Sequence, residues 1–556
     1  MKKLVITVVL ALASVMVAKA AEEGFLKGKV LKIDMTEPIA EVGKGGGMFD
    51  IPVSLPIDIG IGGGSAMSLL DAELALKHAA QDKDIAMIYL NYDNFSAPTA
   101  ACEEIRRYLV EFSKAGKPIV AYGNSLSNGS YYIASAADRV FLNPRGSGTL
   151  SGLSSSSYYL KDLLDTLGID IKLIRHGKFK SAGEMYIRNH MSPENRRQTE
   201  AFMSAMWSTL ATEIAESRGV EVDQLNALVD SLALSTADTW VEKGLVDGLK
   251  YKDQMEQYIC HLFGTTDPDQ VKRVEFKEYA SKVKKGSGKK IAILYADGEI
   301  SRSGNEIAGD KFAAQVRKVR EDKDIKAVVF RVNSPGGEVV AADIIRREME
   351  LLCKEKPVVA SYSSYAASGG YWISVGCKKI MCDNTTITGS IGVFGVVPNV
   401  GGAMSKVLKV NMDHVGTNAH SGVGSIFKGL DETEEAWYQQ EIEDIYTNFL
   451  NVVADGRGMT PEQVDELAQG RVWAGKDAFT IGLADEKGSL LDAIDYIAGE
   501  AGLEKYKIVT YPEKSKGMFG SSKKDSKKKP LVLVENIVSE PGFKAMAIAP
   551  YIVVEM

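Results

Sequence analysis

Cysteine and histidine are scarce in this sequence of 556 residues, which contains five cysteines and six histidines. The cysteines are odd in number and widely scattered, so we expect no disulfide framework and assign most of them to buried positions. The sequence does not decide whether Cys377 and Cys382 form a disulfide. The sequence has no C-x-x-C pair, no H-E-x-x-H motif and no histidine spacing typical of a metal site. We therefore expect neither a metal ion nor a cofactor.

An excess of basic residues is also missing. Lys and Arg total 66 against 73 Asp and Glu, and the net charge of −7 is modest for this length. Binding to nucleic acid requires a basic face, so we expect no nucleic-acid partner. The length itself exceeds what one hydrophobic core usually supports, which predicts at least two domains.

Beyond residue 20, no apolar run is long enough to span a bilayer. Residues 1–20 contain a basic start, a 15-residue apolar stretch and the triplet Ala18-Lys19-Ala20. This arrangement is typical of an export signal with an A-x-A cleavage site. The apolar stretch is shorter than the ~20 residues of a spanning helix, although an anchor that is never removed is an equal alternative. In either case the rest of the chain is expected to be exported.

The chain contains an internal duplication. The segment DKDIAMIYLNYDN from Asp82 matches DKDIKAVVFRVNS from Asp322, and NGSYYIAS from Asn128 matches SGGYWISV from Ser368, both at an offset of 240 residues. In each copy short β-branched runs alternate with helical patterns, which predicts an α/β fold with βαβ units and a largely parallel sheet. The expected divisions are a signal or anchor at 1–20, a first domain at 25–275, a linker at 276–290, a second domain at 291–510 and a basic low-complexity tail at 511–556.

The two copies differ where a reaction site would lie. Ser368, within SYAASGGYWIS, corresponds to Asn128, which has no hydroxyl group. The glycine pair of NSPGG, Gly336 and Gly337, has no counterpart in YDNFS of the first copy. If these residues served only the fold, both copies should need them. The asymmetry therefore favours Ser368 as a nucleophile over a small residue in a tight turn.

A serine nucleophile needs a neighbouring group that removes its proton. One candidate is His420 of the second copy. Others are Lys178 and Lys180, in the first-copy segment IRHGKFKSAGEM, whose counterpart in the second copy contains no lysine. A lysine can act as a base when burial lowers its pKa. Because serine and lysine occur in opposite copies, we favour one site shared between the copies and keep His420 as the alternative.

Several of these motifs resemble a known family. The segments SYAASGGYWIS, TGSIGVFG, RVNSPGG, GKFKSAGEMY and MSPENR are similar to those of the long, duplicated form of the signal peptide peptidase A (protease IV) family. The resemblance covers about residues 25 to 500. It implies a serine–lysine peptidase with the fold of Clp protease and crotonase, built as tandem domains of repeated ββα units with helical extensions.

The resemblance also implies roles for individual residues. The serine of A-S-G-G, the nucleophile of the family, is Ser368 in this sequence. The lysine of K-S-A, the general base, is Lys180. The serine of T-G-S-I-G, which hydrogen-bonds the lysine and orients it, is Ser390.

The oxyanion that develops in such a reaction needs fixed hydrogen-bond donors. The backbone N–H of Gly369 is one candidate, because it directly follows Ser368 at a helix start. The turn at Gly336 and Gly337 supplies another. Glycine suits these positions because the backbone must approach the substrate closely.

The function implied by the resemblance is that of a serine endopeptidase acting through an acyl-enzyme on signal-peptide remnants and similar hydrophobic peptides. The implied location is the bacterial inner membrane at its periplasmic face, or the soluble periplasm if residues 1–20 are removed. The implied assembly is a homotetramer. Two alternatives remain: an acyl-CoA hydratase or isomerase of the crotonase type, and an exported scaffold without catalytic activity.

Overall fold

The computed structural model describes residues 25–35, 38–42, 66–93, 95, 97–304, 306–512, 545–548 and 554–555. The expected export signal at 1–20 lies outside these residues, as does most of the tail at 511–556. Within the described ranges, no helix combines the length and the apolar character needed to cross a bilayer. All five cysteines are free, so Cys377 and Cys382 do not form the bond that the sequence left open.

The first repeat is built on a six-stranded sheet in which every neighbouring pair of strands is parallel. Its central strands are apolar on both faces, as in the almost fully buried run IAMIYLN. The spatial order is β10 (Arg273–Glu275), β1 (Lys29–Asp34), β4 (Ile85–Asn91), β5 (Ile119–Leu126), β6 (Arg139–Gly148) and β9 (Gly248–Leu249).

The second repeat contains the matching sheet. Its order is β20 (Val472–Ala474), β18 (Ile387–Gly389), β16 (Val358–Ala367), β14 (Ile325–Ser334), β11 (Lys289–Asp297) and β22 (Tyr506–Tyr511), with β17 (Lys379–Cys382) beside β16 and β21 (Glu486–Lys487) beside β17. All pairs are parallel except β18 with β20. The predicted α/β fold with tandem parallel sheets is therefore confirmed, while the likeness to Clp protease and crotonase stays a prediction.

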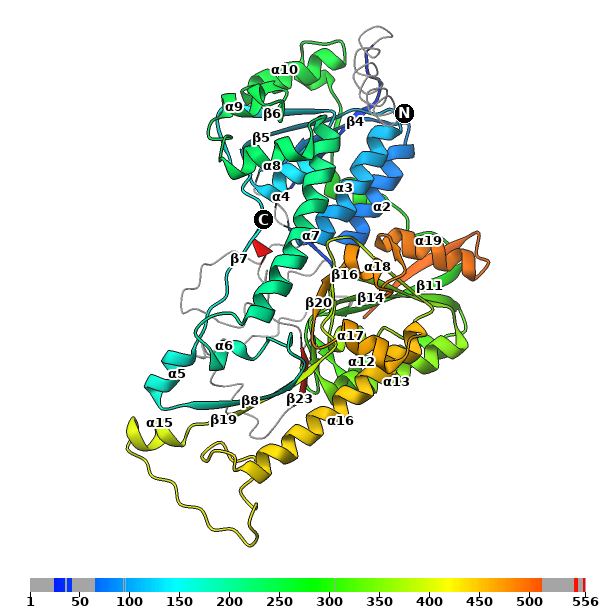
Figure 1. Ribbon diagram of the computed structural model, residues 1–556. Helices are drawn as coiled ribbons and strands as arrows, with labels where there is room; N and C mark the ends of the chain where they lie inside the picture. The colour runs from blue at the N-terminus through cyan, green and yellow to red at the C-terminus, as the bar shows by residue number, and fades with distance from the viewer. Residues whose placement is uncertain are drawn as a thin grey trace.

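Helices α2 and α3 of the first repeat lie between the two sheets (Figure 1). Their apolar residues share one core with Ile293 of β11, Val329 of β14 and residues of α19 (Leu490–Glu500). This common core buries the interface between the repeats. The helices of the first repeat are α2 (Leu69–Gln81), α3 (Thr99–Lys114), α4 (Asn128–Ala134), α5 (Lys161–Leu167), α6 (Glu184–Ile187), α7 (Pro193–Arg218), α8 (Val222–Asp230), α9 (Ala237–Glu242), α10 (Lys252–Leu262), and α11 (Phe276–Lys282), which falls in the predicted linker.

The second repeat reproduces this helix pattern with α12 (Gly309–Glu321), α13 (Val339–Glu355), α14 (Gly369–Trp372), α15 (Gly401–Lys406), α16 (Glu432–Arg457), α17 (Pro461–Leu467), α18 (Gly475–Thr480) and α19 (Leu490–Glu500). The long helices α7 and α16 illustrate the duplication. Each has 26 residues and ends at a glycine in the left-handed conformation, Gly219 or Gly458, which terminates a helix without a Cβ clash. Figure 1 shows α7 crossing from the first repeat to the second.

A third sheet combines both repeats. Its order is β13 (Ile307–Ala308), β12 (Ile300–Ser301), β15 (Gly336–Glu338), β23 (Ala545–Ile548), β19 (Val393–Asn399) and β8 (Asp170–His176). Strand β8 of the first repeat is antiparallel to β19 of the second along its whole length. This pairing places the segment that follows β8 against the second repeat. Two short ladders complete the fold: β2 (Ile39–Ala40) with β3 (Met67–Ser68), and β7 (Ser154–Ser155) with β24 (Val554–Glu555).

Candidate active site

Ser368 lies at the junction between strand β16 and the short helix α14. It is fully buried, and its φ of 56° and ψ of −116° are unusual for a residue with a Cβ atom. The tight junction depends on the following glycines, because a Cβ on Gly370 would lie only 2.6 Å from the backbone oxygen of Ser334. A strained, sharply turned serine of this kind is typical of functional sites rather than of ordinary turns.

Lys180 reaches Ser368 from the first repeat. It lies in the loop between β8 and α6, which is held against the second repeat by a hydrogen bond from the Phe179 backbone N–H to the Gln469 oxygen at 2.9 Å. Gln198 of α7 donates a further bond, of 3.0 Å, to the oxygen of Phe179. Both copies thus contribute side chains to a single buried cluster.

Three oxygen atoms surround the Lys180 amine. Its Nζ lies 2.7 Å from Ser368 Oγ and 3.1 Å from both the hydroxyl and the backbone oxygen of Ser390. The side chain is fully buried. In the part of the chain that the structure describes, no carboxylate lies within ion-pair distance of this amine. Burial therefore acts without compensation and holds the pKa of Lys180 well below its usual value.

Ser390 follows strand β18, which is a neighbour of β16 in the sheet. Its φ of 52° is again left-handed, and its backbone N–H donates to the oxygen of Arg471 at 2.6 Å. This backbone conformation directs both oxygens of Ser390 to the amine of Lys180. The serine is fully buried as well, so its hydrogen bonds are protected from water.

The glycines proposed as oxyanion donors surround the same point. A Cβ on Gly336 would lie 2.7 Å from the backbone nitrogen of Gly369, and one on Gly369 would lie 3.1 Å from that of Gly337. The N–H of Gly336 donates to Ser334 Oγ at 3.2 Å, so it is already used. Gly337 and Gly369 therefore remain as the better pair of donors.

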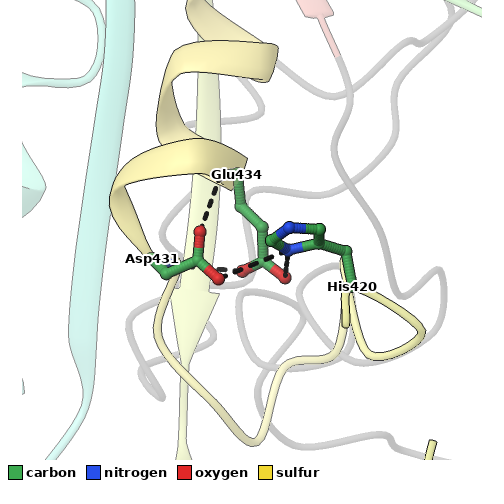
Figure 2. A group of neighbouring side chains, drawn as sticks. All are labelled: His420, Asp431 and Glu434. Atoms are coloured by element: carbon green, nitrogen blue, oxygen red, sulfur yellow. Dashed lines mark hydrogen bonds and ion pairs between the residues drawn. The ribbon is translucent and has the colours of Figure 1, made fainter. Parts of the chain in front are cut away.

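The alternative bases lie elsewhere. Lys178 is exposed, although it is only two residues from Lys180. His420 is near the start of α16, where its Nδ1 lies 3.4 Å from carboxylate oxygens of Asp431 and Glu434 (Figure 2). No contact between His420 and Ser368 is found among the described residues. The structure thus brings Lys180 to the serine and leaves both alternatives outside the cluster.

The group in Figure 2 is the only set of three potential metal ligands among the described residues. Its acidic members have other partners. Asp431 accepts from two backbone N–H groups at the start of α16, and Lys428 Nζ lies 2.7 Å from a Glu434 oxygen. This arrangement is that of a helix cap with a neutralising lysine.

The equivalent position in the first repeat has a structural role. Asn128 donates from its side chain to the oxygen of Gly152 at 2.8 Å and accepts from the N–H of Ser151 at 2.9 Å. Both bonds hold the loop after β6. The residue that replaces the serine therefore bonds to backbone groups and supports a loop.

Two glycines near Lys180 were not foreseen from the sequence. Gly470 has a φ of 77°, and a Cβ on it would lie 2.5 Å from the Cβ of Lys180. A Cβ on Gly392 would lie 3.2 Å from Lys180 Cδ. Both belong to the second repeat, so they form the surface on which the lysine loop docks. Glycine is common in this sequence, with 53 copies, so composition alone offered no signal for these positions.

Known proteins resemble this chain across both repeats. The sequence model of peptidase family S49 matches residues 111–262 and 350–504, one segment in each repeat. The chain is 36% identical over 459 residues to Protease 4 of Salmonella typhi, covering 80% of this chain and 74% of that protein. It is 37% identical over 446 residues to Protease 4 of Haemophilus influenzae, covering 77% and 72%. It is 31% identical over 466 residues to the chloroplastic serine protease SPPA of Arabidopsis thaliana, covering 81% and 68%.

Proposed function

We propose that Ser368 is the nucleophile and Lys180 the general base of this chain, which belongs to peptidase family S49 and is a serine peptidase. The observation that carries the proposal is the 2.7 Å distance between Lys180 Nζ and Ser368 Oγ in a buried site, where no carboxylate of the described residues lies within ion-pair distance. Membership of a peptidase family leaves no support for the alternatives of a crotonase-type hydratase or an inactive scaffold.

In the proposed reaction, neutral Lys180 accepts the proton of Ser368 while the serine oxygen attacks the scissile carbonyl. The protonated lysine then donates to the leaving amine nitrogen, and an ester remains on Ser368. Water then attacks this ester while Lys180 accepts a proton from it. The protonated lysine returns that proton to Ser368 Oγ as the acyl C–O bond breaks, which releases the acid and restores both the serine and the neutral lysine. The lowered pKa of Lys180 supplies the neutral amine that the first step requires.

Ser390 is proposed as a positioning residue for the lysine. A neutral amine has two N–H groups and one lone pair, whereas an ammonium group has three N–H groups. The backbone and hydroxyl oxygens of Ser390, each 3.1 Å from Nζ, accept the two N–H groups. The lone pair is then left for the proton of Ser368. This arrangement fits the neutral form of Lys180.

The backbone N–H groups of Gly337 and Gly369 are proposed to stabilise the oxyanion. Their placement around one point next to Ser368 supports this role, and backbone donors fixed by the fold need no rearrangement during the reaction. Loss of one such donor typically reduces the rate by about 10² to 10³.

We further propose that the peptides cleaved are hydrophobic, such as signal-peptide remnants, and that the protein acts at the periplasmic face of the inner membrane as a homotetramer. The support is the export-type sequence at 1–20 and the resemblance of the motifs around Ser368 and Lys180. Mass measurement of the purified protein tests the assembly, for which a stable monomer would contradict the tetramer.

The catalytic assignment is tested by hydrolysis of a short peptide ester with Ser368→Ala and Lys180→Met. We expect both variants to lose at least about 10³-fold in kcat/KM, because each lacks a group needed for the first step. Lys178→Met is the matched control, since it removes an exposed lysine from the same loop, and it should retain activity, as should His420→Ala. An active Lys180→Met with an inactive His420→Ala would show that the base is the histidine.

A further inference from the structure

Asn333 lies at an irregularity of strand β14, just before the turn of Gly336 and Gly337. Strand β14 is placed between β11 and β16 in the sheet of the second repeat (Figure 1). On the β11 side, Asn333 stands in register opposite Asp297. On the β16 side the register shifts around Asn333, where β16 contains more residues than β14. An irregularity of this kind bends a strand and leaves backbone groups without ladder partners.

The side chain of Asn333 crosses this irregularity. Its Oδ1 accepts from the backbone N–H of Tyr365 on β16 at 3.3 Å, and its Nδ2 donates to Asp297 Oδ1 on β11 at 2.8 Å. The backbone oxygen of Asn333 accepts from the N–H of Gly298 at 2.9 Å. One residue therefore joins three segments of the sheet at the end where the proposed site lies.

Both sides of this connection lead to proposed catalytic groups. Tyr365 precedes Ser368 by three residues, and Asn333 precedes Gly337 by four. The two segments meet closely, since a Cβ on Gly369 would lie 3.1 Å from the backbone nitrogen of Gly337. A small shift of one segment against the other would change where the N–H groups of these glycines point. The side chain of Asn333 opposes such a shift.

This position needs an amide side chain. The N–H of Tyr365 requires an acceptor, and the carboxylate of Asp297 requires a donor, and one amide group supplies both. An aspartate at 333 would supply acceptors only. Burial, and then the charge of Glu41, raise the pKa of Asp297 to about 6, so this carboxyl is ionised at pH 8. A second carboxylate at 333 would therefore meet a like charge there.

The first repeat shows the same position without a reaction site. Asp93 lies there at the offset of 240 residues, and its Oδ1 accepts from the N–H of Ser125 at 3.0 Å. This bond is the counterpart of the one from Tyr365. An acceptor is therefore a requirement of the fold in both repeats, whereas the amide donor occurs only in the repeat that has Gly336 and Gly337.

We infer that Asn333 is a positioning residue for the oxyanion donors, because its side chain holds the turn of Gly337 against the strand that leads to Ser368. The inference rests on the proposed function. Backbone donors that are fixed before the reaction stabilise an oxyanion without rearrangement. Since an oxyanion forms both when the ester of Ser368 is made and when water attacks it, a loosened turn should slow both steps and leave substrate binding unchanged.

Peptide-ester hydrolysis at pH 8 tests this role. We expect Asn333→Ala to lower kcat about 10²-fold and to change KM by less than about twofold, because the donors act only on the oxyanion. A peptide aldehyde forms an adduct with Ser368 that carries this oxyanion, so it should bind more weakly by about the same factor. A role in folding alone would move neither quantity.

Exchange of the two side chains provides a rescue. Asn333→Asp should also lower kcat, because it places a carboxylate beside Asp297. The double variant Asp297→Asn, Asn333→Asp pairs an amide with a carboxylate again, and its residue 333 accepts from Tyr365 as Asp93 does from Ser125. It should regain at least about 10-fold in kcat over Asn333→Asp. Because Asn333→Asp keeps the size of the side chain, this comparison remains possible if Asn333→Ala does not fold.

Asp93→Ala is the matched control, since it removes the corresponding acceptor from the first repeat. It should lower the midpoint of urea unfolding, as Asn333→Ala does, and keep its kcat. If Asn333→Ala changes only the urea midpoint, or if the double variant is no faster than Asn333→Asp, the inference is wrong and the proposed function stands. If the parent does not hydrolyse the ester, or Ser368→Ala hydrolyses it equally well, the proposed function itself fails.

Discussion

Lys180 is an ionisable residue that the fold removes completely from water. Its amine lies among three oxygens of two serines, and no described carboxylate offsets the loss of hydration. Burial therefore favours the neutral form and lowers the pKa. The same property that makes the lysine a base makes it unfavourable for folding.

The pH dependence of activity follows from this pKa. Hydrolysis requires neutral Lys180, so kcat/KM should rise with pH through the lowered pKa and level off well below the pH of about 10.4 at which a free lysine titrates. A pH profile of ester hydrolysis measures this midpoint. Lys180→Arg should be inactive at every pH, because a guanidinium does not lose its proton in this range. A midpoint near that of free lysine would contradict the assignment.

Stability should respond to the same group. Between the lowered pKa of the folded state and the ordinary pKa of the unfolded state, the unfolded chain binds one more proton, so the contribution of Lys180 to stability increases as pH rises. Lys180→Met removes this penalty. We expect it to unfold at a higher urea concentration than the parent at pH 6 and to lose part of that advantage at pH 9. Lys178→Met, in the same loop, should show neither effect.

Among the elements, the loop after β8 depends on a close contact with the turn that contains Gly470. That glycine is left-handed, and a Cβ on it would lie 2.5 Å from the Cβ and 2.6 Å from the backbone nitrogen of Lys180. The contact allows no side chain on the second repeat at this point. The position of the lysine is thus set by the packing of one backbone against another.

Gly470→Ala should therefore move the lysine loop and reduce ester hydrolysis by at least about 10²-fold, because small displacements of a catalytic group are costly. Gly458→Ala is the matched control. It has a similar φ of 64°, but a Cβ there would meet nothing within 4 Å. Both variants should lose about 1 kcal/mol of stability from left-handed strain. Equal activity of the two variants would show that the contact with Lys180 is unimportant.

The two repeats are joined by a buried ionic network as well as by the apolar core. Arg331 of β14 is fully buried and pairs with Glu41 at 2.9 Å and with Glu104 of α3 at 2.6 Å, both in the first repeat. It also donates to Ser361 at 2.9 Å. Since the site needs one side chain from each repeat, this interface is a condition for the proposed activity.

Arg331→Met should weaken the association of the repeats. It leaves two buried carboxylates without their cation, which typically costs about 3 to 5 kcal/mol, and it should lower the midpoint of urea unfolding. Arg347→Met is the control, since Arg347 pairs with Glu350 on an exposed helix surface and such pairs contribute about 1 kcal/mol or less. Unfolding of Arg331→Met at the same midpoint as the control would exclude a role for the network.

The fold class, the duplication and the shared site could be predicted from the sequence because they depend on local patterns. The alternation of apolar runs and helical stretches indicated the α/β fold, and the repeat at an offset of 240 residues indicated two copies. The loss of Ser368 in one copy and of the lysine in the other pointed to a shared site. These features follow from the identity and the spacing of residues, and both are given by the sequence itself.

The remaining features depend on contacts between distant segments. Lys178 and Lys180 are two residues apart, and only the resemblance of K-S-A distinguished them in the sequence. The structure leaves Lys178 exposed and buries Lys180 against the second repeat. Gly470 and Gly392 matter because the lysine loop packs on them. Likewise, the sequence Ala545-Met546-Ala547 does not predict a strand. Residue types and repeats were therefore determined by the sequence alone. The burial of Lys180, and with it the lowered pKa, arose only when the two copies packed together, and the place of β23 was decided by its pairing with β15 and β19.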